Sequence, residues 1–157
     1  MTATGLNHVS VRAIDLEESV RFYVDVFGME RIPSPDFERP VEWLRLGDQQ
    51  FHLFRDDAPA PKYHHLGIDV DDFESVFKKA SELGILDGGT HGSAVRELPG
   101  GEVQMYIRDP AGNLVEIDWP DVRTLDRSVT GEIPKLADAV PQSEEAMRAR
   151  LYTRGSL

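Results

Sequence analysis

The sequence predicts an α+β fold in which one strand–helix–strand unit occurs twice along the chain. Two observations support this prediction. His8 is followed seven residues later by Asp15, and His65 seven residues later by Asp72. After each aspartate an amphipathic run ends at a glycine, and the copies are offset by 57 residues at His and Asp and by 56 at Gly. A nearly constant offset of this length is typical of two copies of one supersecondary unit.

The first copy reads as a strand, a helix and further strands. Alternation of apolar and polar side chains indicates the strands, because successive side chains of a strand point to opposite faces. Asp15 and Glu18 form a capping-box arrangement before the helix, and Gly28 supplies its end. The predicted elements are a strand at 5–12, a helix at 16–27, a short strand near 29–32, and a hairpin of 41–46 and 49–55.

The second copy repeats this plan after a linker at residues 56–62. Its predicted elements are a strand at 65–70, a helix at 73–83, a Gly-rich loop, and a hairpin of 103–108 and 113–119. The repeat ends near residue 120, and the tail that follows contains one predicted short helix at 143–151. The predicted organisation is one domain at 1–120, with module one at 5–55 and module two at 63–119, followed by a C-terminal extension at 121–157.

Composition excludes several classes of function. A net charge of −11 argues against nucleic acid or an anionic membrane as a partner. The chain has no cysteine, so thiolate nucleophiles, disulfides and Cys-bound zinc are excluded, and any metal must use His, Asp or Glu. The apolar runs are too short to span a bilayer, and residues 1–7 lack signal-peptide character. We therefore expect a cytoplasmic protein with a small-molecule substrate.

Polar side chains share the sheet face that the helices do not cover. The apolar phase of each strand must face its helix, which leaves the other phase on the opposite face. The residues of that phase are His8, Ser10, Arg12, Gln50, His52, Phe54, His65, Gly67, Asp69, Tyr106, Glu116 and Asp118. The repeat equates His8 with His65 and His52 with Glu116, so a pseudo-twofold axis would bring these four together. Nitrogen and oxygen ligands without sulfur suit Fe(II), Zn, Mn, Co or Ni.

Several of these segments resemble one known group of proteins. They are Gly5-Leu6-Asn7-His8, Phe22-Tyr23, Phe27-Gly28-Met29, His64-His65-Leu66-Gly67 and the run from Tyr106 to Glu116. Over about residues 5–119 the chain resembles the vicinal oxygen chelate superfamily, which includes glyoxalase I, methylmalonyl-CoA epimerase, extradiol dioxygenases and fosfomycin-resistance transferases. The resemblance implies paired βαβββ modules and metal ligands at His8, His65 and Glu116. The fourth ligand position of glyoxalases falls on His52, where they usually carry a carboxylate.

The resemblance implies a metal-dependent lyase or isomerase. In glyoxalase-like or epimerase-like proton transfer, a divalent metal holds two substrate oxygens and stabilises an enediolate while a carboxylate moves the proton. Glu116 is one candidate base, and Glu42 lies near the position of an epimerase catalytic glutamate. His52 is expected as a fourth ligand or as a base beside the metal, and Tyr106 is a further catalytic candidate.

Other functions remain open at this stage. Residues 106–116 resemble the signature of Fe(II)-dependent extradiol dioxygenases. That signature also places a histidine at about positions 97–99, which are Glu, Leu and Pro here, and His91 lies too far along the sequence. Thiol transfer to fosfomycin is a weaker alternative because residues 98–102 lack a serine-rich loop. A metal-free binding or resistance protein is a third alternative, although such proteins generally lose the ligand set that this chain retains.

The predicted substrate is small, anionic and bidentate. Ser10, Arg12, Gln50 and Tyr106 lie on the predicted site face and are the candidates for binding it, since a guanidinium suits a carboxylate. Arg12 could instead neutralise an aspartate of the same face, Asp69 or Asp118. With a neutral histidine at position 52, the site keeps one carboxylate ligand, which favours an anion. By analogy with the family we also expect a homodimer.

Overall fold

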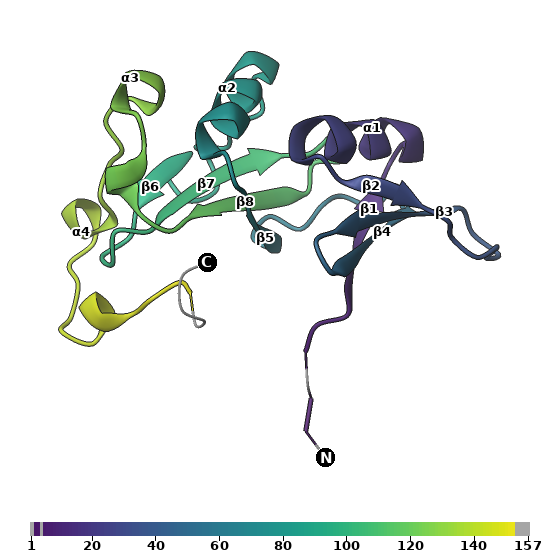
Figure 1. Cartoon of the computed structure of the whole chain (residues 1–157), viewed down its shortest axis with the longest axis horizontal. Helices are drawn as coiled ribbons and strands as arrows, with labels where there is room; N and C mark the ends of the chain where they lie inside the picture. Colours follow the sequence, from purple (N-terminus) through teal and green to yellow (C-terminus); the bar gives the residue numbers. More distant parts are fainter. Residues whose placement is uncertain (1, 4, 153–157) are drawn as a thin grey trace. The chain divides into compact units, whose positions relative to one another are not determined.

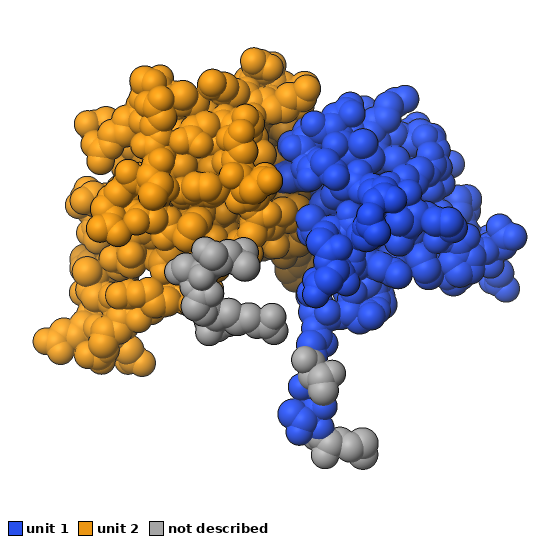
Figure 2. Space-filling view, in the orientation of Figure 1, with its two compact units in different colours: residues 1–61, 109–113 blue, residues 62–108, 114–157 orange. Residues whose placement is uncertain are grey.

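The computed structural model describes residues 2, 3 and 5–152. It divides the chain into two compact units (Figure 2). Unit 1 contains residues 1–61 and 109–113, and unit 2 contains residues 62–108 and 114–157. Each unit carries one copy of the predicted repeat, and the C-terminal tail is grouped with unit 2. The domain boundary expected near residue 120 stays a prediction.

Unit 1 consists of a four-stranded sheet with one helix on it (Figure 1). Its elements are β1 (His8–Ala13), α1 (Leu16–Phe27), β2 (Glu30–Ile32), β3 (Val41–Leu46) and β4 (Gln49–Arg55). The strand order is β1-β4-β3-β2, with β1 parallel to β4 and the other pairs antiparallel. Asp15 caps α1 by accepting from the Glu18 amide at 2.9 Å, and Gly28 ends it at φ 64°, where a glycine fits without strain.

Unit 2 repeats this plan with the strand order β5-β8-β7-β6. Its sheet and main helix are β5 (His65–Asp69), α2 (Phe73–Leu83), β6 (Val95–Glu97), β7 (Val103–Arg108) and β8 (Leu114–Trp119). Asp72 caps α2 by accepting from the Ser75 amide at 2.9 Å, and Gly84 ends it. The predicted α+β fold of two βαβββ modules is therefore confirmed.

Strand register inside each unit shows which residues of the two copies occupy equivalent positions. In unit 1, His52 pairs with Ser10 across the parallel β1–β4 ladder, and in unit 2, Glu116 pairs with Gly67 across the β5–β8 ladder. Ser10 and Gly67 each stand two residues beyond the histidine that opens their copy. His52 and Glu116 thus occupy the same place in the two sheets, as the sequence predicted.

The helix-facing side of each sheet forms the core. In unit 1 the fully buried side chains belong to Tyr23, Leu44, Phe51 and Leu53, and in unit 2 they include Phe73, Ala80, Met105 and Ile117. These buried residues fix the register of the strands, because a shift of one residue would move the whole apolar set to the other face of the sheet. Burial of the apolar phase therefore fixes which polar residues occupy the open face.

The loop at Asp109–Asn113 joins β7 to β8 but belongs to unit 1. Asp109 accepts hydrogen bonds from the Tyr23 hydroxyl at 2.9 Å and from the amides of Ala111 and Asn113 at 2.9 and 2.8 Å. Arg12 donates to the Ala111 carbonyl, and Asn113 donates to the Arg12 carbonyl. Burial raises the pKa of the Tyr23 hydroxyl, and the Asp109 carboxylate raises it further. The hydroxyl therefore keeps its proton and donates a hydrogen bond to Asp109. Asp109 and Asn113, both in the run from Tyr106 to Glu116, therefore fix the conformation of this loop.

Two sequence expectations about elements were wrong. The Gly-rich stretch expected to be a loop contains β6, a three-residue strand that alternation could not reveal because it is too short. The tail does contain short helices, at Arg127–Thr130 and Leu136–Ala139, but the segment 143–151 that was expected to form one has only a 3-10 turn at Ala146–Arg148. So short a segment gains too few hydrogen bonds to propagate a helix.

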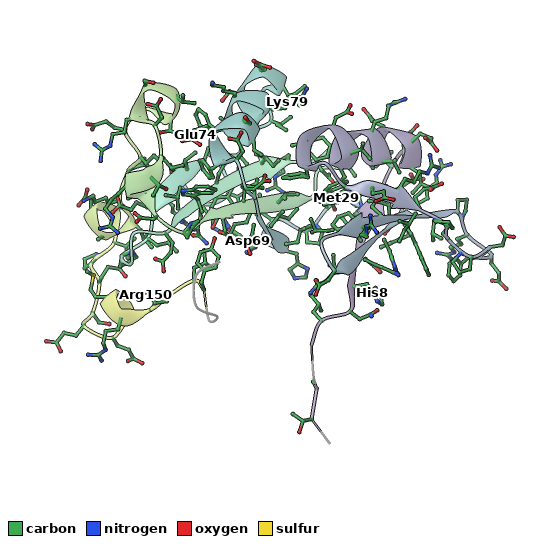
Figure 3. All side chains as sticks on the ribbon, in the orientation of Figure 1. His8, Met29, Asp69, Glu74, Lys79 and Arg150 are labelled. Atoms are coloured by element: carbon green, nitrogen blue, oxygen red, sulfur yellow. The ribbon has the colours of Figure 1, made fainter. Side chains whose placement is uncertain are left out.

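The tail contains three further short elements, namely a 3-10 turn at Val122–Thr124, α3 (Arg127–Thr130) and α4 (Leu136–Ala139). The tail is tied to the sheet and helix of unit 2. Glu74 lies on α2 (Figure 3). Its carboxylate accepts from the Asp126 amide at 2.9 Å. Within the described residues, none of the helices is both long and apolar enough to cross a membrane.

Candidate metal centre

His65 and Glu116 approach each other from the neighbouring strands β5 and β8 of unit 2. The His65 Nε2 atom lies 3.4 Å from Glu116 Oε2, and the Glu116 side chain is 7 % exposed. The other ring nitrogen, Nδ1, lies 2.9 Å from the Tyr63 carbonyl oxygen. Because a carbonyl only accepts, Nδ1 carries the proton of the neutral ring and the Nε2 lone pair faces the carboxylate.

A lone pair and a carboxylate that face each other need a positive species between them. A proton on His65 would satisfy them, and so would a divalent cation. Two atoms 3.4 Å apart can each lie about 2.1 Å from one ion at close to a tetrahedral angle. The donor set, one imidazole nitrogen and one carboxylate oxygen, suits Zn, Fe, Mn, Co or Ni. His65 and Glu116 therefore fit a metal ion.

A hydrogen-bond chain orients the Glu116 carboxylate. Gln104 Nε2 donates to Glu116 Oε1 at 2.6 Å, which leaves Oε2 toward His65. Gln104 Oε1 accepts from the Tyr106 hydroxyl at 3.2 Å and from Arg96 Nε at 3.3 Å. Arg96 also donates to the Tyr106 hydroxyl at 2.7 Å. Such partners fix the orientation of a ligand and tune a bound metal.

Arg96 brings an unneutralised positive charge to this network. Among the described residues no carboxylate forms an ion pair with Arg96, and its guanidinium lies 5.1 Å from the centre of the Tyr106 ring. Burial raises the pKa of the Tyr106 hydroxyl, and the Glu116 carboxylate raises it further. Tyr106 is therefore protonated at neutral pH, and its single O–H is donated to Gln104. Arg96 is the member of this pair that keeps further N–H donors for an anion.

His8 shows in unit 1 the orientation that His65 shows in unit 2. It is exposed at the start of β1 (Figure 3), and its Nδ1 atom lies 3.0 Å from the Asn7 side-chain oxygen. An amide oxygen accepts, so Nδ1 carries the proton and Nε2 keeps its lone pair. The two repeat-equivalent histidines thus present the same nitrogen for a ligand bond.

His52 is held differently from these two histidines. Its Nε2 atom lies 2.8 Å from Gln50 Oε1, so Nε2 carries the proton and Nδ1 keeps the lone pair. The ring stacks on Trp43 at 4.3 Å and 5°, and on His8 at 4.4 Å and 20°. Burial lowers the pKa of His52, and His8 lowers it further. His52 is therefore a neutral imidazole at neutral pH.

The predicted ligands fall into two pairs, one in each unit. His8 and His52 touch in unit 1, and His65 and Glu116 touch in unit 2. In the described ranges 2–3 and 5–152, neither unit by itself gathers three His, Asp or Glu side chains that could hold a metal ion. The joint site of His8, His52, His65 and Glu116 thus stays a prediction.

Comparison with known proteins identifies the family of the chain. The model of the Glyoxalase/Bleomycin resistance protein/Dioxygenase superfamily matches residues 5–117. The chain belongs to this superfamily. A curated relative, Glyoxylase I 4 of Arabidopsis thaliana, is 32% identical over 127 residues, which cover 73% of this chain and 70% of the relative. Mouse mitochondrial methylmalonyl-CoA epimerase is 29% identical over 134 residues, with 72% and 71% covered.

A solved structure agrees with these relatives. A glyoxalase family protein from Bacillus anthracis is 27% identical, with a TM-score of 0.58, and the alignment covers 75% of this chain and 96% of that protein. The superfamily match ends at residue 117, so the elements of the tail lie outside it.

Three other predicted site residues have contacts that limit what they can do. Glu42 pairs in register with buried Leu53, so it lies on the helix side of its sheet, and its carboxylate is 2.7 Å from Arg31. The sequence already held this information, because Glu42 alternates with Trp43. Gln50 is bonded to His52, and the guanidinium of Arg12 donates to two backbone carbonyls. The roles predicted for Glu42, Gln50, Arg12 and Ser10 stay predictions.

Sequence reasoning missed Arg96, Gln104 and Trp43, and it set His91 aside as too distant along the chain. Arg96 was hidden in the stretch expected to be a loop. Trp43 could have been found, because hairpin register places it opposite His52. His91 is distant in sequence, but its ring lies 4.6 Å from that of Tyr106 and 6.2 Å from that of His65. Burial lowers the pKa of His91, as does the charge of Arg96.

Asp118 is a buried carboxyl two residues beyond Glu116. It is 7% exposed, and its Oδ1 atom has no hydrogen-bond partner among the described residues. Burial raises the pKa of Asp118 to about 8, with Glu116 and Asp69 raising it in the same direction. Burial raises the pKa of the Tyr152 hydroxyl, and the nearby Asp69 carboxylate raises it further. The end of the described tail thus lies against the polar face of the unit 2 sheet.

We expect the substitution Asp118→Asn to remove a pH dependence of stability. A carboxyl whose folded pKa is raised binds more protons in the folded state than in the unfolded state, so stability falls as pH rises toward about 8. Between about pH 5 and 8 the free energy of unfolding of the variant, relative to that of the wild type, should rise by up to about 1.4 kcal/mol per pH unit. Denaturant unfolding with a chelator present measures this gain. The exposed Asp57→Asn is the control, and parallel wild-type and Asp118→Asn profiles would contradict the assignment.

Proposed function

We propose that the protein is a metal-dependent enzyme that transfers a proton on a small anionic substrate bound through two oxygens, in the manner of a glyoxalase or an epimerase. The single observation that carries the proposal is the facing pair of His65 Nε2 and Glu116 Oε2, 3.4 Å apart. His8, with its Nε2 free, is the proposed third ligand. The curated relatives Glyoxylase I 4 and methylmalonyl-CoA epimerase support the reaction class.

The stacking of His52 on His8 supports one of the two roles that the sequence left open for His52. An imidazole binds a cation through a lone pair that lies in the ring plane. The two rings are 4.4 Å apart and inclined by only 20°, so no single ion can lie in both planes within bonding distance. If His8 is a ligand, His52 is therefore a neighbouring group. The proposed protein ligands are then two imidazoles and one carboxylate, which leave positions for a chelating substrate.

The bound cation would act as a Lewis acid that polarises the substrate oxygens. The protein supplies the remaining functions through its own side chains. Arg96 would donate hydrogen bonds to the anion, Tyr106 positions Arg96 by accepting from it, and Gln104 keeps Glu116 in position. The neutral His52 imidazole, with a free Nδ1 lone pair, is the proposed base, because a base must be unprotonated at the working pH.

One observation favours oxygen chemistry as a second candidate function. The extradiol signature calls for a histidine near the tyrosine, and the sequence offered none at the expected positions. The structure places His91 against Tyr106 at 4.6 Å and near His65 at 6.2 Å. His91 could serve an Fe(II)-dependent dioxygenase as the missing acid or base. The identity of the bound metal discriminates, since iron favours oxygenation and nickel, cobalt or zinc favours proton transfer.

The first prediction of this proposal concerns metal content. Purified protein should carry close to one divalent ion per chain, measured by elemental analysis and by titration of metal-free protein. His65→Ala removes a proposed ligand and should weaken binding at least about 100-fold, a loss of about 2.7 kcal/mol. The adjacent, exposed His64→Ala is the matched control and should bind like the wild type. Unchanged metal affinity in His65→Ala would disprove the ligand assignment.

The second prediction concerns the reaction. Metal-loaded protein in deuterated water should exchange the acidic C–H proton of methylmalonyl-CoA, followed as loss of its proton NMR signal. Replacing the Arg96 cation by Arg96→Leu should raise KM about ten-fold, because it removes the charge that attracts the anion. Absence of exchange together with oxygen-dependent cleavage of a catechol would favour the dioxygenase instead.

A further inference from the structure

Three aromatic rings from neighbouring strands of unit 1 form one continuous stack. The Trp43 indole on β3 lies 4.3 Å from His52 on β4 at 5°, and His52 lies 4.4 Å from His8 on β1 at 20°. Trp43 and His52 are directly opposite in the hairpin register. The stack ends at the exposed ring of His8, whose Nε2 is free.

We infer that His52 and Trp43 are positioning residues that fix the ring plane of His8 for metal binding. The inference rests on the proposed function, because it needs His8 as a ligand. His8 is exposed, and apart from its bond to Asn7 its ring is held by the stack. An exposed side chain must lose rotational freedom when it binds a metal, and prior ordering lowers that cost. Aromatic pairs supply the ordering because parallel, offset rings attract one another.

His52 is itself held on two sides, which allows it to act as a support. Gln50 fixes the in-plane direction of its Nε2 at 2.8 Å, and the indole covers the ring face that His8 does not touch. Trp43 is half-buried, and Phe37 approaches its outer side at 6.1 Å. Trp43 therefore restricts the ring of His52, and His52 in turn restricts the ring of His8.

The stack also suits the charge that arrives with a metal. A cation on His8 Nε2 makes that imidazole electron-poor, and an electron-poor ring is attracted to the face of an electron-rich one. His52 is an aromatic ring with the Trp43 indole on its other face. A charged or aliphatic side chain at position 52 would offer no such surface. The stacking geometry thus assigns His52 a role toward His8 that depends on its ring, beside the use of its Nδ1 as the proposed base.

The distinguishing experiment keeps or removes the ring at position 52. His52→Phe retains a stacking ring without a ligand nitrogen, and His52→Ala removes both. Co(II) affinity is measured by titration calorimetry, and the visible absorption spectrum of bound Co(II) reports its ligands. His52→Phe should bind within about two-fold of the wild type with an unchanged spectrum. His52→Ala should bind about ten-fold more weakly, as should Trp43→Ala, whereas Trp43→Phe should resemble the wild type.

The outcomes separate the inference from the proposed function. If the wild type binds no Co(II), the proposed function fails and the inference fails with it. If the wild type binds and His52→Phe loses affinity as His52→Ala does, with a changed spectrum, His52 is a ligand and the inference is overturned. Wild-type affinity in both Ala variants would also overturn it. Circular dichroism checks folding, and the Trp43 pair gives an independent reading if His52→Ala fails to fold.

Discussion

The Nε2 lone pair of His65 faces the Glu116 carboxylate at 3.4 Å, and the rest of the unit 2 sheet is arranged to maintain that contact. The parallel β5–β8 ladder sets the spacing, since Gly67 lies beside Glu116 in register. A side chain at Gly67 would be crowded, because a Cβ there would lie 3.0 Å from Asp118 Oδ2. Tyr63 and Gln104 then turn the two functional groups toward each other. Without a cation or a proton between them, this pair is repulsive.

The two copies of the module place chemically different side chains at equivalent positions. Glu116 and Tyr106 in unit 2 form a charged, hydrogen-bonded network. Their counterparts in unit 1, His52 and Trp43, form a neutral stack. In the proposed site, the duplicated backbone would supply the anionic ligand from one copy and a neutral support from the other. A divalent cation would then have one protein carboxylate, a balance that suits an anionic substrate.

Much of the fold could be predicted from the sequence, because alternation and capping are local signals. Asp15 and Asp72 cap helices where expected, and burial of the apolar phase places His8, His65 and Glu116 on one kind of face. What sequence could not supply depends on contacts between distant segments. His91 reaches Tyr106 only after the loop that follows α2 has folded back, and the tail lacks the periodicity that would indicate its short helices.

Hydrogen-bond direction was also beyond sequence reasoning. The residue type at position 52 suggested a ligand, and only the contacts of its ring distinguish it from His8. Gln50 accepts a hydrogen bond from Nε2 of His52, the nitrogen that is the proposed ligand atom in His8 and His65. Trp43 stacks on one face of the His52 ring. The proposed role of each of these histidines thus depends on which of its ring nitrogens is hydrogen-bonded to a neighbouring residue.

The most direct measurement is heteronuclear NMR of the histidine ring nitrogens, recorded on metal-free protein and again after addition of zinc. The account predicts that His8 and His65 carry their proton on Nδ1 and His52 on Nε2, as their hydrogen bonds require. Zinc should then shift the Nε2 resonances of His8 and His65 strongly and leave the Nδ1 resonance of His52 near its metal-free position. A large zinc-induced shift at His52, or none at His65, would contradict the account.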